Sequence, residues 1–289
     1  MGDLICSLPL LEALKGYFNK SKITLLIDAR LTELANLTKF KDNVVGYKRG
    51  ILSKVGLISR LEKNKYDMAV VLNPLFQGVW LAYLAGAKYR LGYTRDYEGI
   101  QDIRPLSRLL THVIPITDQP THDIQRYLGI ANFLGIDTPL SLSHLDTPDT
   151  IQKWADDFLR DNGIKEGDFI FGINPHAAWE SRCWGTKRFA EVADIVAERY
   201  NAKVIFFGSS AASDMRRINL IRSYLKHKAI YAAGKTDIPR LVALLNRCAL
   251  FLTNDSGPMH LAAALGVDMV ALFGPGDINK FGYRRENII

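Results

Sequence analysis

The chain has 289 residues, of which 48% are hydrophobic and 23% charged, a balance that is typical of a folded protein of two ordinary domains and excludes a disordered chain. The formal net charge of +7 suits a polyanionic partner, but it does not distinguish nucleic acid, an anionic membrane face and phosphorylated substrates. The three cysteines do not have the spacing of a metal site or of a disulfide framework, so we expect reduced thiols. No apolar run reaches the roughly 20 residues that cross a bilayer, and no signal peptide is visible. We therefore expect a cytoplasmic protein.

Short apolar runs alternate with amphipathic stretches along the whole chain. Each run is followed by a turn residue and then by a helical stretch. This pattern predicts an α/β protein, with buried parallel strands that are covered by helices on both faces. The predicted strands are, in chain order, residues 23–28, 68–73, 169–173, 204–208, 250–253 and 269–273.

Residues 138–148 interrupt this rhythm with two prolines and several Ser and Thr residues. We therefore expect a domain boundary there, between an N-terminal α/β domain of residues 1–145 and a C-terminal α/β domain of residues 146–289. Ligands of open α/β sheets sit outside the carboxyl ends of the strands. Two such domains that face each other would form a cleft between them.

Both chain ends look incomplete. The chain opens on Met1-Gly2-Asp3, a strand-to-helix turn with no strand before it, and stops soon after the glycine-rich turn 274–277. A missing central strand would leave exposed backbone groups and apolar surface. We expect either a start that has been assigned too late or a fragment that is truncated at both ends.

Several nucleotide-binding and catalytic motifs are absent. Gly274-Pro275-Gly276 is followed by Asn279 where a G-x-G-x-x-G motif needs its third glycine, and Gly234-Lys235-Thr236 lacks the earlier glycine of a P-loop. No G-x-S-x-G elbow or H-E-x-x-H helix occurs. These absences argue against NAD-dependent oxidoreductases, P-loop NTPases, α/β-hydrolases and zincins.

Three segments, 2–14, 174–190 and 254–275, together resemble the lipopolysaccharide heptosyltransferase family, glycosyltransferase family 9. The third segment is long and specific, and weaker matches at 85–93 and 233–236 keep the family order. The resemblance implies a GT-B fold of two Rossmann-like domains facing across a cleft. It also implies an inverting transferase that moves heptose from ADP-heptose to the inner core of lipopolysaccharide. The sequence has no metal-ligand cluster, and a helix dipole with an arginine can replace a metal at the diphosphate, so we expect no metal and no cofactor.

The resemblance places Asp3 at the family's general-base position. A carboxylate on a rigid turn can take the proton of an acceptor hydroxyl, and Gly2 would let the backbone pass close to the acceptor. Since Asp is also a favoured N-cap residue, the alternative is that Asp3 merely caps the helix that follows it.

The resemblance places the donor diphosphate at Asp255-Ser256-Gly257-Pro258, where a predicted strand ends and a helix over 259–265 begins. Helix N-termini offer free N–H groups and a positive dipole end to phosphate, and proline suits the first helical turn. Asp255 would organise the loop, or bind ribose or a bridging donor. An ordinary capped helix is the alternative.

The resemblance also places a basic residue, Arg182, against the diphosphate, where an arginine can make a forked contact. A solvated surface arginine is the alternative, and Lys187 or Arg188 could exchange roles with it. Lys235 and Thr236 are expected to frame the nucleotide.

This sequence departs from the family at one position of the nucleotide site. The family often has an acidic residue that contacts the nucleoside, and this residue follows shortly after the strand that ends here at Gly208. Ser210 stands at its usual place, and the acid is displaced to Asp214 or absent. We keep Ser210 among the expected donor contacts, and the identity of the nucleotide stays open.

Basic residues collect between Lys39 and Lys65, where Lys48 and Arg49 are candidate contacts of a phosphorylated glycolipid acceptor or of the cytoplasmic face of the inner membrane. The alternative is an ordinary solvated surface. His176 is a further candidate for the acceptor site, with a structural histidine as the alternative. No aromatic interleaving or recognition helix supports nucleic acid.

Two other hypotheses remain open. The first is a transferase or epimerase that uses another nucleotide sugar in the same fold. The second is a non-catalytic homologue that binds sugar nucleotide or a partner protein, although the presence of Asp3, Arg182 and Asp255 together argues against it.

Overall fold

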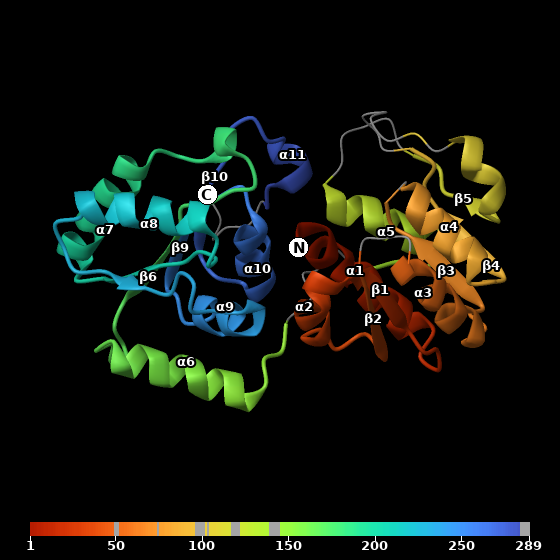
Figure 1. Cartoon of the computed structure of the whole chain (residues 1–289), viewed down its shortest axis with the longest axis horizontal. Helices are drawn as coiled ribbons and strands as arrows, with labels where there is room; N and C mark the ends of the chain where they lie inside the picture. The colour runs from red at the N-terminus through yellow and green to blue at the C-terminus, as the bar shows by residue number, and fades with distance from the viewer. Residues whose placement is uncertain are drawn as a thin grey trace. The chain divides into compact units, whose positions relative to one another are not determined.

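A computed structural model describes residues 1–48, 52–73, 75–95, 102, 104–116, 122–138 and 145–283, with backbone alone for 52–55. The chain packs as two compact units (Figure 1). The C-terminal unit comprises Leu142–Ile289 together with Met1–Cys6 and Asn36–Lys39, and the N-terminal unit comprises Ser7–Ala35 and Phe40–Ser141. The first six residues, which the sequence analysis placed in the N-terminal domain, therefore pack with the C-terminal unit.

The C-terminal unit contains a parallel sheet of five strands in the order β10-β9-β6-β7-β8. The chain runs from β6 to β7 and β8 in one direction and then returns to β9, beside β6, and continues to β10 in the other direction. The carboxyl ends of β6 and β9 therefore form the topological switch point, where ligands bind in sheets of this kind. The strands are β6 (Ile170–Asn174), β7 (Lys203–Phe206), β8 (Ile230–Tyr231), β9 (Leu250–Asn254) and β10 (Met269–Leu272).

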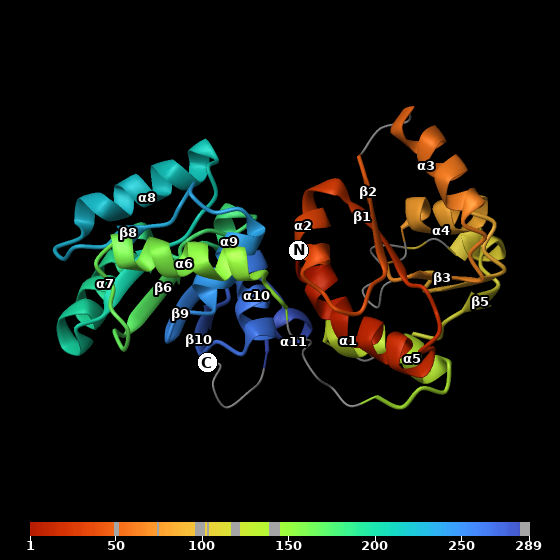
Figure 2. The same cartoon turned by 90° about the horizontal axis from the view of Figure 1, so that it is seen from below.

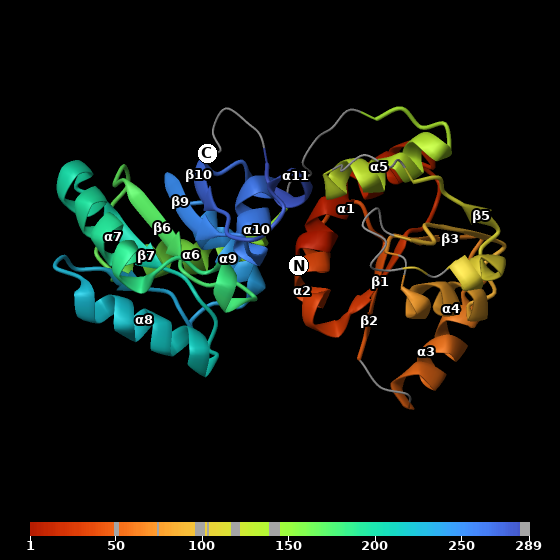
Figure 3. The same cartoon turned by 90° about the horizontal axis from the view of Figure 1, so that it is seen from above.

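Helices cover both faces of this sheet. In Figure 1, α6 and α9 lie below the strands, and α7 packs against α8. Figures 2 and 3 show the same pairing, with α6 beside α9 and α7 beside α8. The helices are α6 (Asp149–Asp161), α7 (Thr186–Tyr200), α8 (Ala212–Tyr224), α9 (Ile238–Leu245), α10 (Gly257–Leu265) and α11 (Ile278–Phe281), with a 3-10 turn at Glu180–Arg182.

The core of the C-terminal unit forms because every residue of β6 is buried and packs against neighbours on both faces. Phe171, Phe189 and Phe206 belong to one apolar cluster between the sheet and α7. Gly172 lets β6 pack closely, since a Cβ there would lie 2.8 Å from the Cys248 sulfur. This rigid sheet fixes the loops that follow β6, β9 and β10.

The N-terminal unit contains two parallel sheets, β1-β2 and β3-β4-β5. The strands are β1 (Thr24–Asp28), β2 (Asn43–Tyr47), β3 (Met68–Val71), β4 (Tyr89–Gly92) and β5 (His112–Val113). The helices of this half of the chain are α1 (Gly2–Tyr17), α2 (Thr32–Asn36), α3 (Leu52–Lys63), α4 (Phe76–Leu84) and α5 (Asp123–Phe133), with 3-10 turns at Ala29–Leu31 and Arg104–Leu109. The start of α1, up to Cys6, and the last residue of α2, Asn36, belong to the C-terminal unit. Within the described ranges, none of the helices combines the length and the apolar character that crossing a membrane requires.

Candidate functional site

Asn174, the last residue of β6, ties together the loops at the switch point. Its buried side-chain amide donates to the backbone carbonyl of His176 at 3.1 Å and to the hydroxyl of Ser256 at 3.1 Å. The neighbouring strand contributes in the same way, because the Asn254 side-chain oxygen accepts from the backbone N–H of Trp184 at 3.1 Å. The loops after β6 and β9 therefore form one hydrogen-bonded structure.

Arg182 and Asp255 form an ion pair inside this structure. The Arg182 Nη1 lies 2.8 Å from the Asp255 Oδ2, and the side chains are 28% and 4% exposed. Burial raises the pKa of Asp255 above its ordinary value, and the charge of Arg182 opposes that rise. Arg182 is thus held at the end of the sheet by a buried carboxylate, which is unlike a solvated surface arginine.

The glycine-rich turn after β10 packs against this ion pair. A Cβ at Gly276 would overlap the Asp255 carboxylate, and a Cβ at Gly274 would lie 2.9 Å from the carbonyl oxygen of Ser181. Only glycine allows the backbone so close at these two positions. The loops after β6, β9 and β10 therefore converge on Arg182 and Asp255.

Helix α10 begins at this point without a capping side chain. Ser256 occupies the N-cap position with extended φ and ψ of −158° and 170°, and its side chain makes no capping hydrogen bond. Its hydroxyl instead lies 3.2 Å from the Thr253 hydroxyl and accepts from Asn174. Pro258 stands in the first turn. The Ser256 side chain therefore does not cap α10, and the anion site at this helix end stays a prediction.

Asp3 lies near the same helix. A Cβ at Gly257 would lie 2.8 Å from the Met1 sulfur, and a Cβ at Gly2 would lie 2.8 Å from the Nε2 of His260. His260 is held in turn by a 2.7 Å hydrogen bond between its Nδ1 and the Tyr283 hydroxyl. Because α1 begins at Gly2, the exposed Asp3 stands inside the first helical turn and not at the N-cap. The structure therefore brings Asp3 into the unit that contains the Asp255 loop.

Asp214, the displaced acid, is engaged inside the protein. Its Oδ2 accepts from the backbone N–H and the hydroxyl of Ser209 at 3.0 and 2.6 Å, and its Oδ1 lies 3.4 Å from the Nδ1 of His176. Burial favours a higher pKa of Asp214, but the hydrogen bonds from Ser209 and Ser213 and the neighbouring His176 together outweigh burial and lower this pKa. Asp214 thus anchors the loop after β7 to His176.

His176 is buried between Asp214 and Gly208. Its Nε2 has no hydrogen-bond partner in the part of the chain that the structure describes, and a Cβ at Gly208 would lie 2.7 Å from it. Burial lowers the pKa of His176 to about 4, although the nearby Asp214 charge raises it in part. The ring is therefore neutral near pH 7 and serves as a packed linker between two loops.

We expect this burial to make folding pH-dependent. Since the folded-state pKa of His176 is about 4 against an ordinary 6.5, the unfolded chain binds the proton more tightly, and stability is lost as pH falls from 6.5 towards 4. The loss approaches about 3 kcal/mol, at about 1.4 kcal/mol per pH unit. Urea unfolding between pH 7 and 4.5 measures it.

His176→Gln should flatten this pH dependence. His227→Gln is the matched control, since His227 also lies beside an aspartate, Asp194 at 3.2 Å, but is 44% exposed. An equal pH dependence in wild type and His176→Gln would contradict the assignment.

The remaining donor candidates follow β7 and β8. Ser210 is exposed, and its Cα lies 3.6 Å from the position of a Cβ on Gly234, whose φ is +72°. Lys235 follows in the same turn, with its Nζ 5.9 Å from the centre of the Phe158 ring, and Thr236 is half-buried. Ser210 and residues 234–236 are therefore neighbours at the carboxyl edge of the sheet.

Two other basic residues near Arg182 have different partners. Lys187 pairs with Glu191 at 3.9 Å, and the Arg188 guanidinium lies 5.8 Å from the centre of the Trp184 ring. Of Arg182, Lys187 and Arg188, Arg182 is thus the one that is paired with Asp255.

The candidate acceptor residues belong to different units of the chain. Lys48 is exposed directly after β2 in the N-terminal unit, whereas His176 belongs to the C-terminal unit. Arg49 lies outside the described residues. Lys39, the first residue of the basic segment, pairs with Asp146 at 2.8 Å in the C-terminal unit.

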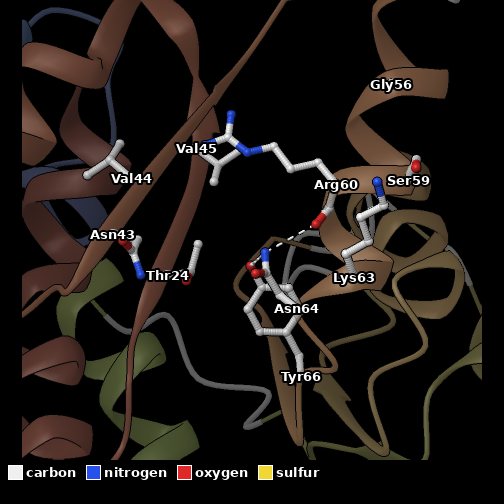
Figure 4. A pocket seen from close by; sticks show the side chains of 10 residues that line it. All are labelled: Thr24, Asn43, Val44, Val45, Gly56, Ser59, Arg60, Lys63, Asn64 and Tyr66. Atoms are coloured by element: carbon white, nitrogen blue, oxygen red, sulfur yellow. Dashed lines mark hydrogen bonds between the residues drawn. The ribbon is translucent and has the colours of Figure 1, made fainter.

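A pocket of about 450 Å³ lies at the other end of β1 and β2 (Figure 4). Its lining includes Thr24 and Asn43, which begin these strands, and Arg60 and Lys63 from the last turns of α3. Ligands of open α/β sheets bind at the carboxyl edge, so this pocket is on the opposite edge from Lys48. The basic segment is therefore divided between two edges of the unit.

Three comparisons place the chain among known proteins. The sequence model described as Glycosyltransferase family 9 (heptosyltransferase) matches residues 55–288. Lipopolysaccharide heptosyltransferase 3 of Escherichia coli (strain K12) is 28% identical over 305 aligned residues, which cover 100% of this chain and 84% of that protein.

Two solved structures extend the comparison to the fold. A glycosyltransferase family 9 protein from Veillonella parvula DSM 2008 superposes with a TM-score of 0.89 at 28% identity, over 100% of this chain and 83% of that chain. E. coli ADP-heptose lps heptosyltransferase II superposes with a TM-score of 0.83 at 23% identity, over 100% and 86% of the two chains, which shows likeness of fold. The chain therefore belongs to glycosyltransferase family 9 and is a glycosyltransferase with the GT-B type of α/β fold.

Proposed function

We propose that this protein transfers heptose, with inversion, from ADP-heptose to the inner core of lipopolysaccharide. The names of its relatives support this substrate pair, since one is a lipopolysaccharide heptosyltransferase and another an ADP-heptose heptosyltransferase. The observation that carries the proposal is the Arg182–Asp255 ion pair beside the start of α10, where Ser256 makes no capping hydrogen bond, at the switch point of the sheet.

The donor diphosphate is proposed to lie on Ser256 and Gly257, at the start of α10. Negative charge on the diphosphate grows as the bond to the sugar breaks, and the helix dipole and free N–H groups stabilise it there. Arg182 uses its Nη1 for Asp255, and a guanidinium has five N–H donors, so the group can bind phosphate as well. Asp255 orients this arginine.

Asp3 is proposed as the general base. The acceptor hydroxyl oxygen attacks the anomeric carbon of the heptose from the side opposite the diphosphate, and its proton passes to the Asp3 carboxylate. The new carbon–oxygen bond forms while the bond to the diphosphate breaks, and ADP leaves. Displacement from the opposite side inverts the anomeric centre. Lys48 and Arg49 are proposed to meet phosphates of the glycolipid acceptor.

The nucleoside is proposed to bind between Ser210 and the turn at Lys235 and Thr236. Because Asp214 is engaged by Ser209 and His176, it does not supply the acidic contact that the family resemblance leads us to look for. A transferase for another nucleotide sugar is therefore the second candidate function.

Calorimetric titration with ADP, UDP and GDP separates these two candidates. We expect ADP to bind more tightly than UDP and GDP, and we expect the same ADP affinity with EDTA present because the donor site is proposed to need no metal. Lys187→Met, which removes a nearby exposed charge, is the control and should bind ADP like wild type. If ADP binds no better than UDP or GDP, the heptose donor is wrong; if EDTA removes binding, metal independence is wrong.

A further inference from the structure

The pocket at the start of β1 and β2, which no step of the proposed transfer uses, is lined by one polar face of α3 (Figure 4). Four lining residues recur every three or four positions along this helix and therefore share a face: Gly56, Ser59, Arg60 and Lys63. A different face of α3 anchors the helix, because Leu57 and Leu61 are buried in an apolar cluster with Val45 of β2. The polar face is thus held in front of the two strands.

The end of α3 fixes the groups on one side of the pocket. The side-chain amide of Asn64 donates to the backbone carbonyl of Arg60 and to the hydroxyl of Tyr66, both at 3.1 Å (Figure 4). Lys65 has a φ of +48°, the left-handed conformation that commonly terminates a helix. The helix end and the Tyr66 hydroxyl are therefore joined into one hydrogen-bonded turn.

The charge of the lining is positive. Arg60 and Lys63 are its charged members among the described residues, and no Asp or Glu is found with them. Since a helix C-terminus favours cations in its last turn, their charge alone does not indicate a ligand. In front of them, however, lies a cavity of about 450 Å³, within the range of roughly 300–1,000 Å³ that small-molecule sites occupy. Figure 4 shows the Arg60 side chain extending from α3 toward Val45.

The pocket is distinct from the edge of the sheet where the acceptor candidates lie. Thr24 and Asn43 begin β1 and β2, whereas Lys48 directly follows the end of β2. A strand rises about 3.3 Å per residue, so the two edges are roughly 15 Å apart. A ligand in this pocket would therefore not occupy the position proposed for the acceptor.

We propose that this pocket binds a small phosphorylated sugar. A phosphomonoester carries nearly two negative charges at pH 7 and three strong acceptor oxygens, which match the guanidinium fork of Arg60 and the ammonium of Lys63. The hydroxyl and amide groups of Ser59, Thr24 and Asn43 can exchange hydrogen bonds with the hydroxyls of a sugar ring. Charge and hydrogen-bonding groups thus line one cavity.

A lipid headgroup fits this lining less well. Val44 and Val45 are its aliphatic members among the described residues, and they are half-buried and buried. The large exposed hydrophobic side chains of the described chain lie elsewhere. An acyl chain would therefore find little apolar surface at the pocket, whereas a soluble polar ligand needs none.

Calorimetric titration of the full chain with glucose 6-phosphate, inorganic phosphate and glucose tests the proposal. Excess ADP is present, so that phosphate groups do not bind at the proposed donor site. We expect one glucose 6-phosphate for each chain and about tenfold or more weaker binding of inorganic phosphate, which lacks the hydroxyl contacts. Glucose alone should give no measurable binding.

The decisive variant is Arg60→Gln with Lys63→Gln, which should raise the Kd for glucose 6-phosphate roughly 10- to 100-fold through lost charge-assisted contacts. Ser59→Leu keeps both charges but obstructs the cavity, and it should weaken binding as well. The matched control is Lys20→Gln with Lys22→Gln, which removes two exposed cations from the segment before β1 and should bind like wild type. Thermal unfolding checks that each variant is folded.

No binding of glucose 6-phosphate by wild type, unchanged binding by either pocket variant, or equal loss in the control would overturn the proposal. Inorganic phosphate that binds as tightly as glucose 6-phosphate would exclude a sugar phosphate as the ligand. Displacement of glucose 6-phosphate by phosphatidylglycerol vesicles, but not by phosphatidylcholine vesicles, would instead assign the pocket to a lipid headgroup.

The pocket and the donor site can fail independently. Normal ADP affinity in Arg60→Gln with Lys63→Gln, together with lost glucose 6-phosphate binding, supports the pocket as a separate site. A wild-type protein that binds ADP no better than UDP or GDP contradicts the donor proposal alone, because the pocket residues take no part in it.

Discussion

Asp3→Asn should abolish transfer while leaving donor binding unchanged. The substitution keeps the shape of the side chain and removes its ability to accept a proton, and a positioned general base contributes roughly 100- to 10,000-fold to rate. We therefore expect kcat to fall by that factor while the Kd for ADP stays the same. Because Asp3 is exposed in the first turn of α1, the free energy of unfolding should fall by no more than about 1 kcal/mol.

The matched control is Asp149→Asn, which removes an acidic residue from the first turn of α6 in the same unit. Stopped assays of ADP release measure turnover, and calorimetry measures donor binding for both variants. Unchanged turnover in Asp3→Asn would remove Asp3 from the base role, and equal losses in the two variants would indicate a general effect of charge.

Arg182→Met should weaken donor binding and destabilise the fold together. A charge-assisted contact to phosphate contributes about 1.5–3 kcal/mol, so the Kd for ADP should rise roughly 10- to 100-fold. The same change leaves Asp255, which is 4% exposed, without its cation, and breaking such a buried pair costs about 3 kcal/mol of unfolding free energy.

The pH dependence of this destabilisation has a definite sign. Burial already raises the pKa of Asp255 and Arg182 opposes the rise, so the variant raises this pKa further. A carboxyl whose folded-state pKa is raised favours the folded state when protonated and costs stability as pH rises above its ordinary value of 3.8. The stability deficit of Arg182→Met should therefore be larger at pH 7 than at pH 4.5.

A double variant separates the two roles of Arg182. Arg182→Met with Asp255→Asn removes the unpaired buried charge and should recover most of the lost stability, while the Kd for ADP stays high. Lys187→Met controls for loss of a nearby positive charge that is 73% exposed. Recovery of ADP affinity along with stability would show that Arg182 acts only on the fold.

The six strands that the sequence predicts are confirmed as β1, β3, β6, β7, β9 and β10, because each is an apolar run between turn residues. The sequence missed β5 and β8, which have two residues each, and also β2 and β4, in which polar residues and glycine interrupt the apolar run. Such short strands are stabilised by pairing with a neighbour in the sheet, as Ile205 pairs with Ile230. The partner strand is distant in the sequence, so a short stretch of sequence does not reveal the pairing.

In the candidate site, too, contacts between residues that are distant in the sequence could not be predicted from local patterns. The Asp255 loop was predictable because a strand, a glycine and a proline before an apolar helix are adjacent in the sequence. The Arg182–Asp255 pair joins residues 73 positions apart, and local patterns do not indicate which arginine meets which aspartate. Gly274 and Gly276 were interpreted as a failed dinucleotide motif, and Gly274 also as part of the family resemblance. Their close packing against Ser181 and Asp255 was not predicted, although two glycines directly after a buried strand indicate a close approach of the backbone.

Asp3 is the residue whose surroundings the sequence predicted least well. Its position near the chain start placed it in the N-terminal domain, whereas contacts of Gly2 with His260 and of Met1 with Gly257 assign the first six residues to the C-terminal unit. The base and the diphosphate loop are thus proposed to be held by the same rigid element, α10.

The most direct measurement is transfer itself. Wild-type protein is incubated with ADP-heptose and an inner-core glycolipid that lacks the heptose, and the acceptor is analysed by mass spectrometry while ADP release is followed. We expect one added heptose for each ADP released by the wild-type protein, and roughly 100- to 10,000-fold slower addition with Asp3→Asn. An acceptor left unmodified by ADP-heptose but glycosylated from a UDP- or GDP-sugar would contradict this expectation.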